Sequence, residues 1–385
     1  MGFAQGKDIS IAWTCFLLKI VGLWLAADKA EQRRRHFTLS YTIGAISIDC
    51  VYIACNISYL MIVFFKIAVL YAHRTEFYSL ITFTQNNFWH SNYDYQERII
   101  VEDCAHTCAI FIVVLSFCAQ GTLMDSSLAN IGKNQSERIL PFNMWVDFPT
   151  GMSPYFEILC VYHVGVCYIC FDNFLCLVCL HVASQFRILQ SRLLDLNYVL
   201  SKRIDHGDSD TDTSSYTSQF NNKLKSCVQL HQALTGYCKR LEHIFTLIVL
   251  GQVLFLALVL CLVGYQLLLV CTKTPPSRNV SLVLNFLGTM CQLLMFTYSC
   301  DGLISQSTNV GRAILSTPWT NLPMDRIGRT VRKHVMIIIM RTNKNCGLTA
   351  GGFFPVSLET YTGVLSTAMS YFTLLRQSSL KLTNT

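Results

Sequence analysis

The chain has 385 residues, of which 52% are hydrophobic and only 14% are charged, and its formal net charge is +7. Because soluble globular proteins carry about 25% charged residues, this composition excludes a cytosolic enzyme, and the net charge is no argument for a nucleic-acid partner. A mean hydropathy of +0.39, with several apolar runs long enough to cross a hydrocarbon core, predicts an all-α polytopic membrane protein.

Residues 1–36 are expected to form a cytoplasmic segment that contains an interfacial helix. Within it, Trp13, Leu17 and Trp24 recur at helical spacing and would lie on one face, at the level of the lipid headgroups. Lys19 interrupts the apolar centre of this segment, and the basic residues 33–35 follow it. A signal peptide places its basic residues first, so this interpretation is rejected.

Residues 37–300 are predicted to contain transmembrane helices 1 to 6 and their loops. The stretch 37–71 is too long for one span and slightly short for two, so the basic residues of the loops decide between them. Two spans place 23 Lys and Arg on one side of the membrane and 6 on the other, whereas one span gives 17 against 12. Two spans are therefore expected here. Further spans are predicted at residues 104–124, 155–180, 244–271 and 281–300.

With a last span over residues 353–376, the total is seven helices in an inverted topology. Basic loops stay in the cytoplasm, so the N-terminus is expected inside the cell and residues 377–385 are expected to form an extracellular tail. Three N-x-S/T sequons, at Asn56, Asn134 and Asn279, fall outside or at the outer end of a span. Asn134 and Asn279 are the candidates for glycosylation.

Two patterns resemble metal sites, and neither is expected to bind a metal. Within the polar stretch 201–222, the D-x-D-x-D at residues 208–212 resembles the start of a calcium loop, but the required Gly and Glu are lacking. We expect a flexible cytoplasmic loop instead. Two C-x-x-C pairs, Cys167/Cys170 and Cys176/Cys179, lie on a continuous apolar helix rather than on turns. No metal ligand set, cofactor motif, nucleophile or pair of carboxylates converges in the spans, so an enzyme is not expected.

Residues 301–352 are predicted to form a cytoplasmic anchor region with a helix over residues 325–344. Ile327, Val331, Val335 and Ile338 recur every three or four residues in it and form an apolar stripe. Burial against another subunit and burial within the same chain are equally compatible with this stripe.

The last span carries two different stripes. One is apolar and consists of Phe354, Leu358, Tyr361, Leu365, Ala368, Phe372 and Leu375. The other is polar and consists of Glu359, Thr362, Ser366, Ser370, Thr373 and Gln377. Polar groups at membrane depth must be paired or solvated, so the second stripe predicts either hydrogen bonding to neighbouring helices or the wall of an ion pathway.

Other residues within the spans are candidates for ligand binding or for a charged pair. Asp172 is an acid in an apolar run, and pairing with a loop Arg or Lys is favoured over a direct role; Lys66 is expected to reach the membrane interface. A small-molecule cavity could be lined by large side chains, although ordinary packing explains such residues more often. These are Phe64, Phe65, Phe111, Phe117, Tyr162, Phe286 and Met290.

Several motifs resemble those of the insect odorant receptors, in the right order over nearly the whole chain. Residues 352–361 read GFFPVSLETY and residues 370–375 read SYFTLL, which is similar to the C-terminal signature of that family. The other matching pieces are Leu140-Pro141-Phe142 with Trp145, Gln185-Phe186-Arg187, His231, Leu241-Glu242 and Tyr298-Ser299-Cys300.

The resemblance implies an odorant receptor that binds small, volatile, apolar molecules in a transmembrane pocket and gates a non-selective cation channel. Such receptors are multi-pass proteins of the plasma membrane in sensory neuron dendrites, and they form hetero-tetramers with co-receptor subunits. In the family the last span lines the pore and the preceding helix joins the subunits. The C-terminal pattern of the family can be aligned with this chain through the Tyr-Phe pair that both contain. This alignment implies pore and gate positions at Ser370, Thr373, Leu374, Gln377 and Ser378.

Two departures from the family pattern are visible. Ser378 stands where the family has an apolar residue at its second constriction, which suits a subunit beside a co-receptor that supplies the apolar ring. The first two spans also look shorter than those of the family.

Two other receptor classes are the alternatives. A gustatory-type receptor channel has the same inverted plan, but its usual Thr-Tyr followed by Gln-Phe is not reproduced, since Thr360-Tyr361 leads to Ser-Tyr-Phe. A G-protein-coupled receptor is less favoured, because the third span is not followed by an acid-Arg-Tyr step and the last span has no N-P-x-x-Y.

Overall fold

The computed structural model describes residues 61–87, 93–128, 154–205, 210–270, 276–317, 319–321, 324 and 326–384. The described part is almost entirely helical, as the sequence predicts. After the helix Met61–Ala72 the elements are α3 (Arg74–Asn87), α4 (Tyr95–Leu128), α5 (Pro154–Asp205), α6 (Asp210–Val270), α7 (Pro276–Leu315), η1 (Trp319–Asn321), α8 (Arg326–Thr342), β1 (Thr349–Ala350), β2 (Phe354–Pro355) and α9 (Leu358–Asn384). The predicted interfacial helix and the first predicted span lie outside these residues, as do Asn56 and Asn134; Asn279 lies in the first turn of α7.

Four of the described helices are long and apolar enough to cross a membrane. Their apolar segments are Tyr95–Phe117, Phe171–Leu196, Ser218–Leu267 and Leu282–Leu315, and Met61–Ala72 is a shorter apolar helix. Prolines begin two of the helices, at Pro154 and Pro276, where the missing amide hydrogen costs no hydrogen bond. These segments overlap predicted spans three to six and the end of span two, although their bounds differ from the predicted ones.

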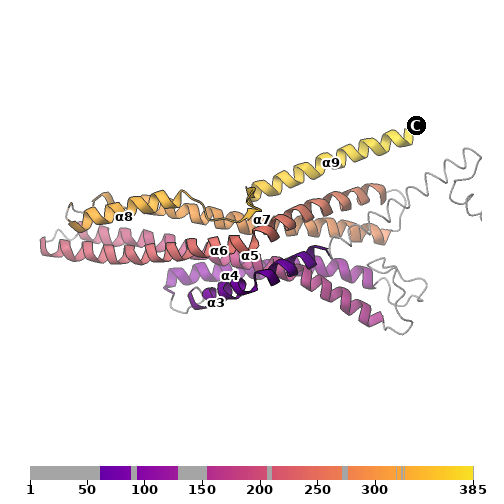
Figure 1. Cartoon of the computed structure of the whole chain (residues 1–385). Coiled ribbons are helices and arrows are strands. Elements are labelled where there is room, and N and C mark those ends of the chain that lie inside the picture. The colour runs from indigo at the N-terminus through magenta and orange to yellow at the C-terminus, as the bar shows by residue number, and fades with distance from the viewer. Residues whose placement is uncertain are drawn as a thin grey trace, which may run out of the picture.

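Two helices extend far beyond the length of a span. The 52 residues of α5 and the 61 residues of α6 correspond to about 78 and 92 Å at a rise of 1.5 Å per residue. A hydrocarbon core is only about 30 Å thick. Both helices extend to the end of the molecule at which α8 lies, and they diverge toward the opposite end (Figure 1).

The structure differs from the loop expected at residues 201–222. Helix α5 continues to Asp205, and α6 begins at Asp210. Phe220, Leu224 and Cys227 recur at helical spacing on α6 and are buried in the core. Tertiary burial of this stripe stabilises a helix that the polar composition alone does not favour.

The buried apolar residues form two cores. The first core contains residues of every α-helix from α3 through α8 and of the hairpin. Its fully buried members include Phe186, Leu234 and Phe245. The second core joins the helix Met61–Ala72 to α4, α5, α6 and α7, and Leu256, Val259 and Leu293 lie at its centre. Because burial of each large aliphatic or aromatic side chain contributes about 1.5–3 kcal/mol, these cores hold the helices together.

Helix α8 packs on its own chain. Val331 and Val335 are fully buried in the first core, and Ile338 is nearly so; the side chain of Ile327 lies outside the described residues. Of the two alternatives for this stripe, burial within the chain is the one observed. The opposite side of α8 exposes a second apolar set, which consists of Met336, Ile337 and Met340.

A short hairpin connects α8 to α9 and is fixed to α6. Strands β1 and β2 are antiparallel, with Ala350 opposite Phe354, and the turn uses Gly351 and Gly352 at φ values of 62° and 79°. Side chains rarely adopt such angles, so glycine is required in this turn. The amide of Gly351 donates to the carbonyl oxygen of Thr246 at 3.1 Å, and Thr246 Oγ1 donates to Thr349 O at 2.9 Å.

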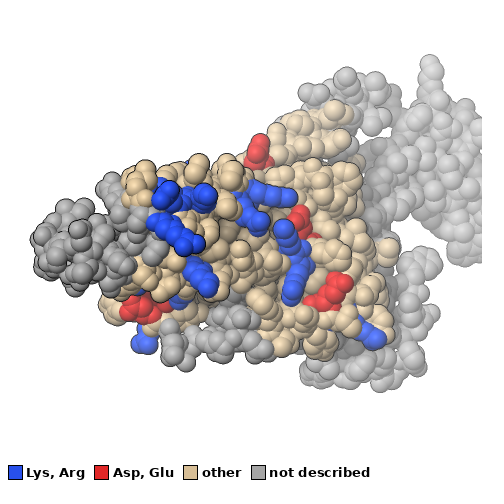
Figure 2. Space-filling model, turned by 60° about the vertical axis from the view of Figure 1, so that its left-hand side comes forward, with Lys and Arg blue, Asp and Glu red and all other residues tan. Residues whose placement is uncertain are grey.

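Basic side chains gather at one end of the molecule. Figure 2 brings forward the end at which α8 lies in Figure 1 and shows many Lys and Arg on it. Exposed basic residues of α8 and the segment after it are Arg326, Arg329, Lys333, Arg341 and Lys344. Helix α9 runs away from this end, and the C-terminus lies at the opposite end (Figure 1).

Candidate functional site

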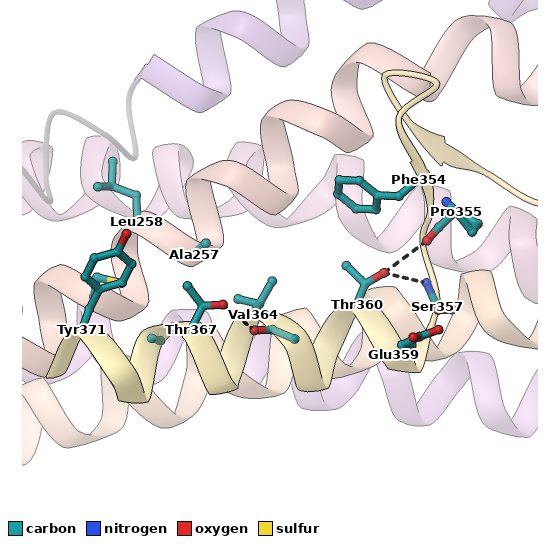
Figure 3. Close-up of a pocket in the computed structure, with 13 residues that line it drawn as sticks. Ala257, Leu258, Phe354, Pro355, Ser357, Glu359, Thr360, Val364, Thr367 and Tyr371 are labelled. Carbon is teal, nitrogen blue, oxygen red and sulfur yellow. Dashed lines mark hydrogen bonds between the residues drawn. The ribbon is translucent and has the colours of Figure 1, made fainter. Parts of the chain in front are cut away.

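Helix α9 begins at a well-defined cap. The hydroxyl of Thr360 accepts a hydrogen bond from the amide of Ser357 at 3.3 Å and donates to Pro355 O at 3.2 Å (Figure 3). The amide of Leu358 donates to Asp301 Oδ1 of α7 at 3.4 Å. These bonds satisfy amides that a helix start otherwise leaves without partners, so the direction of α9 is set where it leaves the hairpin.

The two stripes of α9 lie on different sides, as the sequence predicts. Tyr361, Leu365 and Ala368 of the apolar stripe are half-buried and pack against the second core. Members of the polar stripe are exposed, namely Glu359, Thr362, Ser366, Ser370 and Thr373. Leu374 is also exposed, with 62% of its surface accessible. The side chains of Leu375, Gln377 and Ser378 lie outside the described residues, although α9 continues through these positions.

The hydroxyls of the exposed side bond to the helix that carries them. Thr362 Oγ1 donates to Glu359 O at 2.9 Å, and Ser370 Oγ and Thr373 Oγ1 donate to Ser366 O and Ser370 O, each at 2.8 Å. These bonds do not join α9 to a neighbouring helix of the chain. The oxygen lone pairs stay available on the outer surface of α9, where water, an ion or another subunit can reach them.

A groove of about 660 Å³ separates α9 from α6 (Figure 3). Ala257, Leu258 and Cys261 of α6 form one wall, and the other wall includes Thr360, Val364, Thr367 and Tyr371 of α9. The groove is apolar and open along its length. The residues predicted to bind a ligand do not line it, so the groove and the predicted pocket are different features.

The structure brings only part of the predicted ligand set together. Phe65, Phe286 and Met290 pack against the second core, whereas Phe111 is buried in the first core. Phe64 and Phe117 point outward, with 67% and 78% of their surfaces exposed, and the side chain of Tyr162 lies outside the described residues. A pocket that uses this set would therefore be built around Phe65, Phe286 and Met290.

The second core also contacts α9. An added Cβ at Gly264 of α6 would lie 3.6 Å from Phe372 and 3.8 Å from Phe286. Both rings therefore lie close to one position of α6 that has no side chain of its own. Phe372 belongs to the apolar stripe of α9, so Gly264 lies between this stripe and a residue of the predicted ligand set.

A buried polar cluster borders the second core, and we define it as Lys66, Tyr168, Asp172, Gln252 and Gln292. Lys66 Nζ donates to Asp172 Oδ1 at 2.6 Å, and the exposed fractions of the two residues are 0% and 3%. Both Gln side chains donate to Asp172 Oδ2, that of Gln252 at 2.9 Å. Tyr168 OH donates to Gln292 Oε1 at 2.9 Å. The cluster ties the helix Met61–Ala72, α5, α6 and α7 together.

This geometry corrects one expectation and refines another. Lys66 does not reach the membrane interface, because its ammonium group is buried against the carboxylate. Asp172 is paired, as favoured above, but with a lysine from another helix of the bundle rather than from a loop. An isolated charge at this depth would be costly, and the pair with its two amide donors offsets much of that cost.

Sequence reasoning missed Gln252 and Gln292. Each is a polar residue within an apolar run that predicts a span, and this pattern is the sequence signal of an interhelical hydrogen bond. One atom of the cluster, Gln252 Oε1, is buried without a hydrogen-bond partner. The neighbouring Gly251 is in contact with Phe65, because an added Cβ there would lie 2.7 Å from Phe65 Cε1. The polar cluster and the predicted ligand residues are thus adjacent.

Comparison with known proteins places these features in one family. The family model of the 7tm odorant receptors matches residues 51–369. Odorant receptor 13a of Drosophila melanogaster is 22% identical over 96% of this chain and 96% of its own length. Odorant receptor 10 of Aedes albopictus is 24% identical over 71% of this chain and 69% of its own length.

Solved structures show the same fold. The olfactory receptor OR5 of Machilis hrabei in complex with eugenol matches with a TM-score of 0.64 and 17% identity, over 96% of this chain and 98% of that one. A second structure of the same receptor matches with a TM-score of 0.66 and 16% identity, over the same shares of the two chains.

Proposed function

The chain belongs to the odorant receptor family, whose members are ligand-gated cation channels, and we propose that it is the odorant-binding subunit of such a channel, assembled with co-receptor subunits. The observation that carries this proposal is the exposed polar stripe of α9. Its hydroxyls are satisfied within the helix, while the opposite stripe packs on the bundle. Such a surface is unsuited to lipid and suits a water-filled axis shared by several subunits.

In this assignment Leu374 forms the apolar constriction of the pore. It lies on the exposed side of α9, one residue beyond Thr373. Exposed leucines from several subunits would meet at the axis and hold the closed pore dry. Ser370, Thr373 and Gln377 would line the pore beside it, and Ser378 would leave the second constriction to the co-receptor.

The odorant is proposed to bind in the second core, around Phe65, Phe286 and Met290. An apolar ligand gains about 0.8 kcal/mol for each CH₂ group that it removes from water, so shape decides selectivity more than hydrogen bonding does. Repacking of Phe286 would be transmitted to Phe372 and so to α9 across Gly264. The ligand favours opening only if it binds the open arrangement more tightly than the closed one. The free energy available for opening is the difference between these two binding free energies.

We also propose how the chain assembles and how it is oriented in the membrane, on the basis of the end of the molecule at which α8 lies. Met336, Ile337 and Met340 are exposed there, and we propose that they contact a neighbouring subunit, since contiguous exposed apolar side chains mark interaction surfaces. The basic residues gathered at the same end support a cytoplasmic location for it, with seven spans and an extracellular C-terminus. The proposed location is the plasma membrane of sensory neuron dendrites.

Cysteine accessibility of α9 tests the pore assignment. Ser370→Cys and Leu365→Cys are co-expressed separately with a co-receptor, and odorant-evoked current is recorded before and after a charged methanethiosulfonate reagent. We expect modification to reduce the current in Ser370→Cys, because this position faces the pore, and to leave Leu365→Cys unchanged, because Leu365 packs on the bundle. Equal inhibition of both variants, or current without inhibition in either, would contradict the pore assignment.

A further inference from the structure

Three soft metal ligands meet between α4 and α5. Cys104 and Cys108 lie one turn apart on α4, and His181 faces them from α5. Cys104 Sγ lies 4.0 Å from Cys108 Sγ and 3.8 Å from His181 Nδ1, and the three donor atoms lie within 4.8 Å of one another. Thiolates and imidazole are the donors that zinc prefers in proteins.

The two shorter spacings match those around a metal ion. With Zn–S bonds of about 2.3 Å and Zn–N bonds of about 2.05 Å, a trigonal site separates two sulfurs by about 4.0 Å and a sulfur from a nitrogen by about 3.8 Å. A tetrahedral site needs about 3.8 and 3.6 Å, so these two distances differ from it by only ~0.2 Å. The third pair, Cys108 and His181, lies within 4.8 Å and has to close by more than the other two only if it stands at that limit. We propose that Cys104, Cys108 and His181 bind Zn²⁺, with water in the remaining position.

Burial and charge favour Zn²⁺ over Cu⁺. Cys104 and Cys108 are buried, and His181 is half-buried. Two thiolates and a neutral imidazole cancel the charge of Zn²⁺, whereas the same ligands with Cu⁺ would leave a buried negative charge, which is costly. Binding releases the two thiol protons to solvent, so the affinity rises with pH until both thiols are ionised.

An exposed ion pair lies beside the site. Asp103, the residue before Cys104, pairs with Arg187 at 2.7 Å, and 60% and 42% of their side-chain surfaces are exposed. Such exposed charges belong in water rather than in lipid, so water is expected close to Cys104. The bound ion would fasten α4 to α5 beside the first core, whose members Phe111, Cys179 and Val182 lie close to the ligands in sequence. This proposal does not depend on the proposed odorant function.

Metal content and a spectroscopic signature test the site in the full-length chain. The chain is purified in detergent with a non-thiol reductant, loaded with Zn²⁺, dialysed against a weak chelator and analysed for bound zinc. We expect one tightly held Zn²⁺ per chain, and replacement by Co²⁺ should give thiolate-to-metal charge-transfer absorption. That absorption separates this site from the exposed set His73, Glu76 and His243, which contains no sulfur.

Variants identify the ligands. Cys104→Ser, Cys108→Ser and His181→Gln should each weaken binding by more than the roughly 10- to 100-fold that loss of an outer-shell partner costs. His181→Cys should retain the ion, because it supplies another thiolate, and this outcome is not expected of a merely structural histidine. Cys261→Ser is the control, because Cys261 of α6 is not part of the cluster. This variant should bind Zn²⁺ as tightly as the unmodified chain does.

Three outcomes would overturn the proposal. The first is a folded, monodisperse unmodified chain that shows no thiolate-to-Co²⁺ absorption. The second is unchanged zinc content in the double variant Cys104→Ser/Cys108→Ser, and the third is retention of Cu⁺ without retention of Zn²⁺. Because none of these measurements uses odorant or current, they are independent of the test of the pore.

Discussion

The buried polar cluster around Asp172 and the polar stripe of α9 place hydrophilic groups in apolar helices by opposite means. In the cluster, the carboxylate is surrounded by one ammonium and two amide donors from three other helices. In α9, each hydroxyl bonds only to the backbone of its own helix, and the side chains face outward. The first arrangement is complete within one chain, whereas the second needs water or another subunit.

This difference teaches how to interpret a polar residue in a predicted span. A polar cluster that is buried within one chain holds the helices together, and removing one member leaves its partners buried without hydrogen bonds or counter-ions. An outward-facing polar stripe adds little to the stability of the single chain, and its role is in the assembled channel. Stability and conduction should therefore respond to different variants, from the buried pair down to the hydroxyls of α9.

The largest effect on folding is expected from Lys66→Met. The variant leaves Asp172 buried without its counter-ion, and breaking a buried pair in this way typically costs about 3–5 kcal/mol. The measurement is the thermal unfolding and monodisperse yield of the purified chain. The double variant Lys66→Met/Asp172→Leu should recover much of the loss, because no unpaired charge remains. A double variant that is as unstable as the single one would show that the pair is not the cause.

Gly351→Ala should displace the start of α9 and lower the free energy of unfolding moderately. The residue has a φ of 62°, and a Cβ there would lie 2.8 Å from Leu250 Cδ2, so the hairpin must shift. Such strain costs about 1–3 kcal/mol. We expect folded protein with strongly reduced odorant-evoked current, since the hairpin fixes the start of α9.

Gly352→Ala is the matched control for the hairpin. It introduces the same kind of backbone strain at a φ of 79°, but nothing lies within 4 Å of the added Cβ. Current should therefore fall less in this variant than in Gly351→Ala. Equal loss in both would assign the effect to the turn conformation and not to the contact with α6.

Replacement of the two glutamines of the buried cluster should lower the free energy of unfolding by different amounts. Gln292→Leu removes a donor to Asp172 and also leaves the hydroxyl of Tyr168 without its acceptor, which costs about 1–3 kcal/mol. Gln252→Leu removes one donor but also removes Oε1, a buried atom that has no partner. Thermal unfolding should therefore rank Gln252→Leu as the milder variant. The reverse order would indicate that Gln252 Oε1 has a partner in the membrane.

Most of the described helices, and the side of α9 that packs on the bundle, could be predicted from the sequence, because periodicity and apolar length report burial directly. Pairing between distant positions could not be predicted in the same way. Lys66 and Asp172 are 106 residues apart, and whether two polar residues in different spans meet depends on helix packing. The polar stretch 201–222 was misjudged for a related reason, since Phe220 and Leu224 are buried by helices that local composition does not reveal.

The smallest effect on stability is expected from Ser370→Ala and Thr373→Val. Both hydroxyls are exposed and bond only within α9, so the free energy of unfolding should change by at most about 0.5 kcal/mol. Thr84→Val is the contrasting control, because its buried hydroxyl bonds to Tyr237 OH at 2.8 Å and its loss should cost about 1–3 kcal/mol. With a co-receptor present, the α9 variants should alter relative cation permeability, measured from reversal potentials, while Thr84→Val should lower the amount of current without changing selectivity. Large destabilisation by Ser370→Ala, with unchanged permeability, would mean that the stripe packs against another part of the protein and does not face the pore.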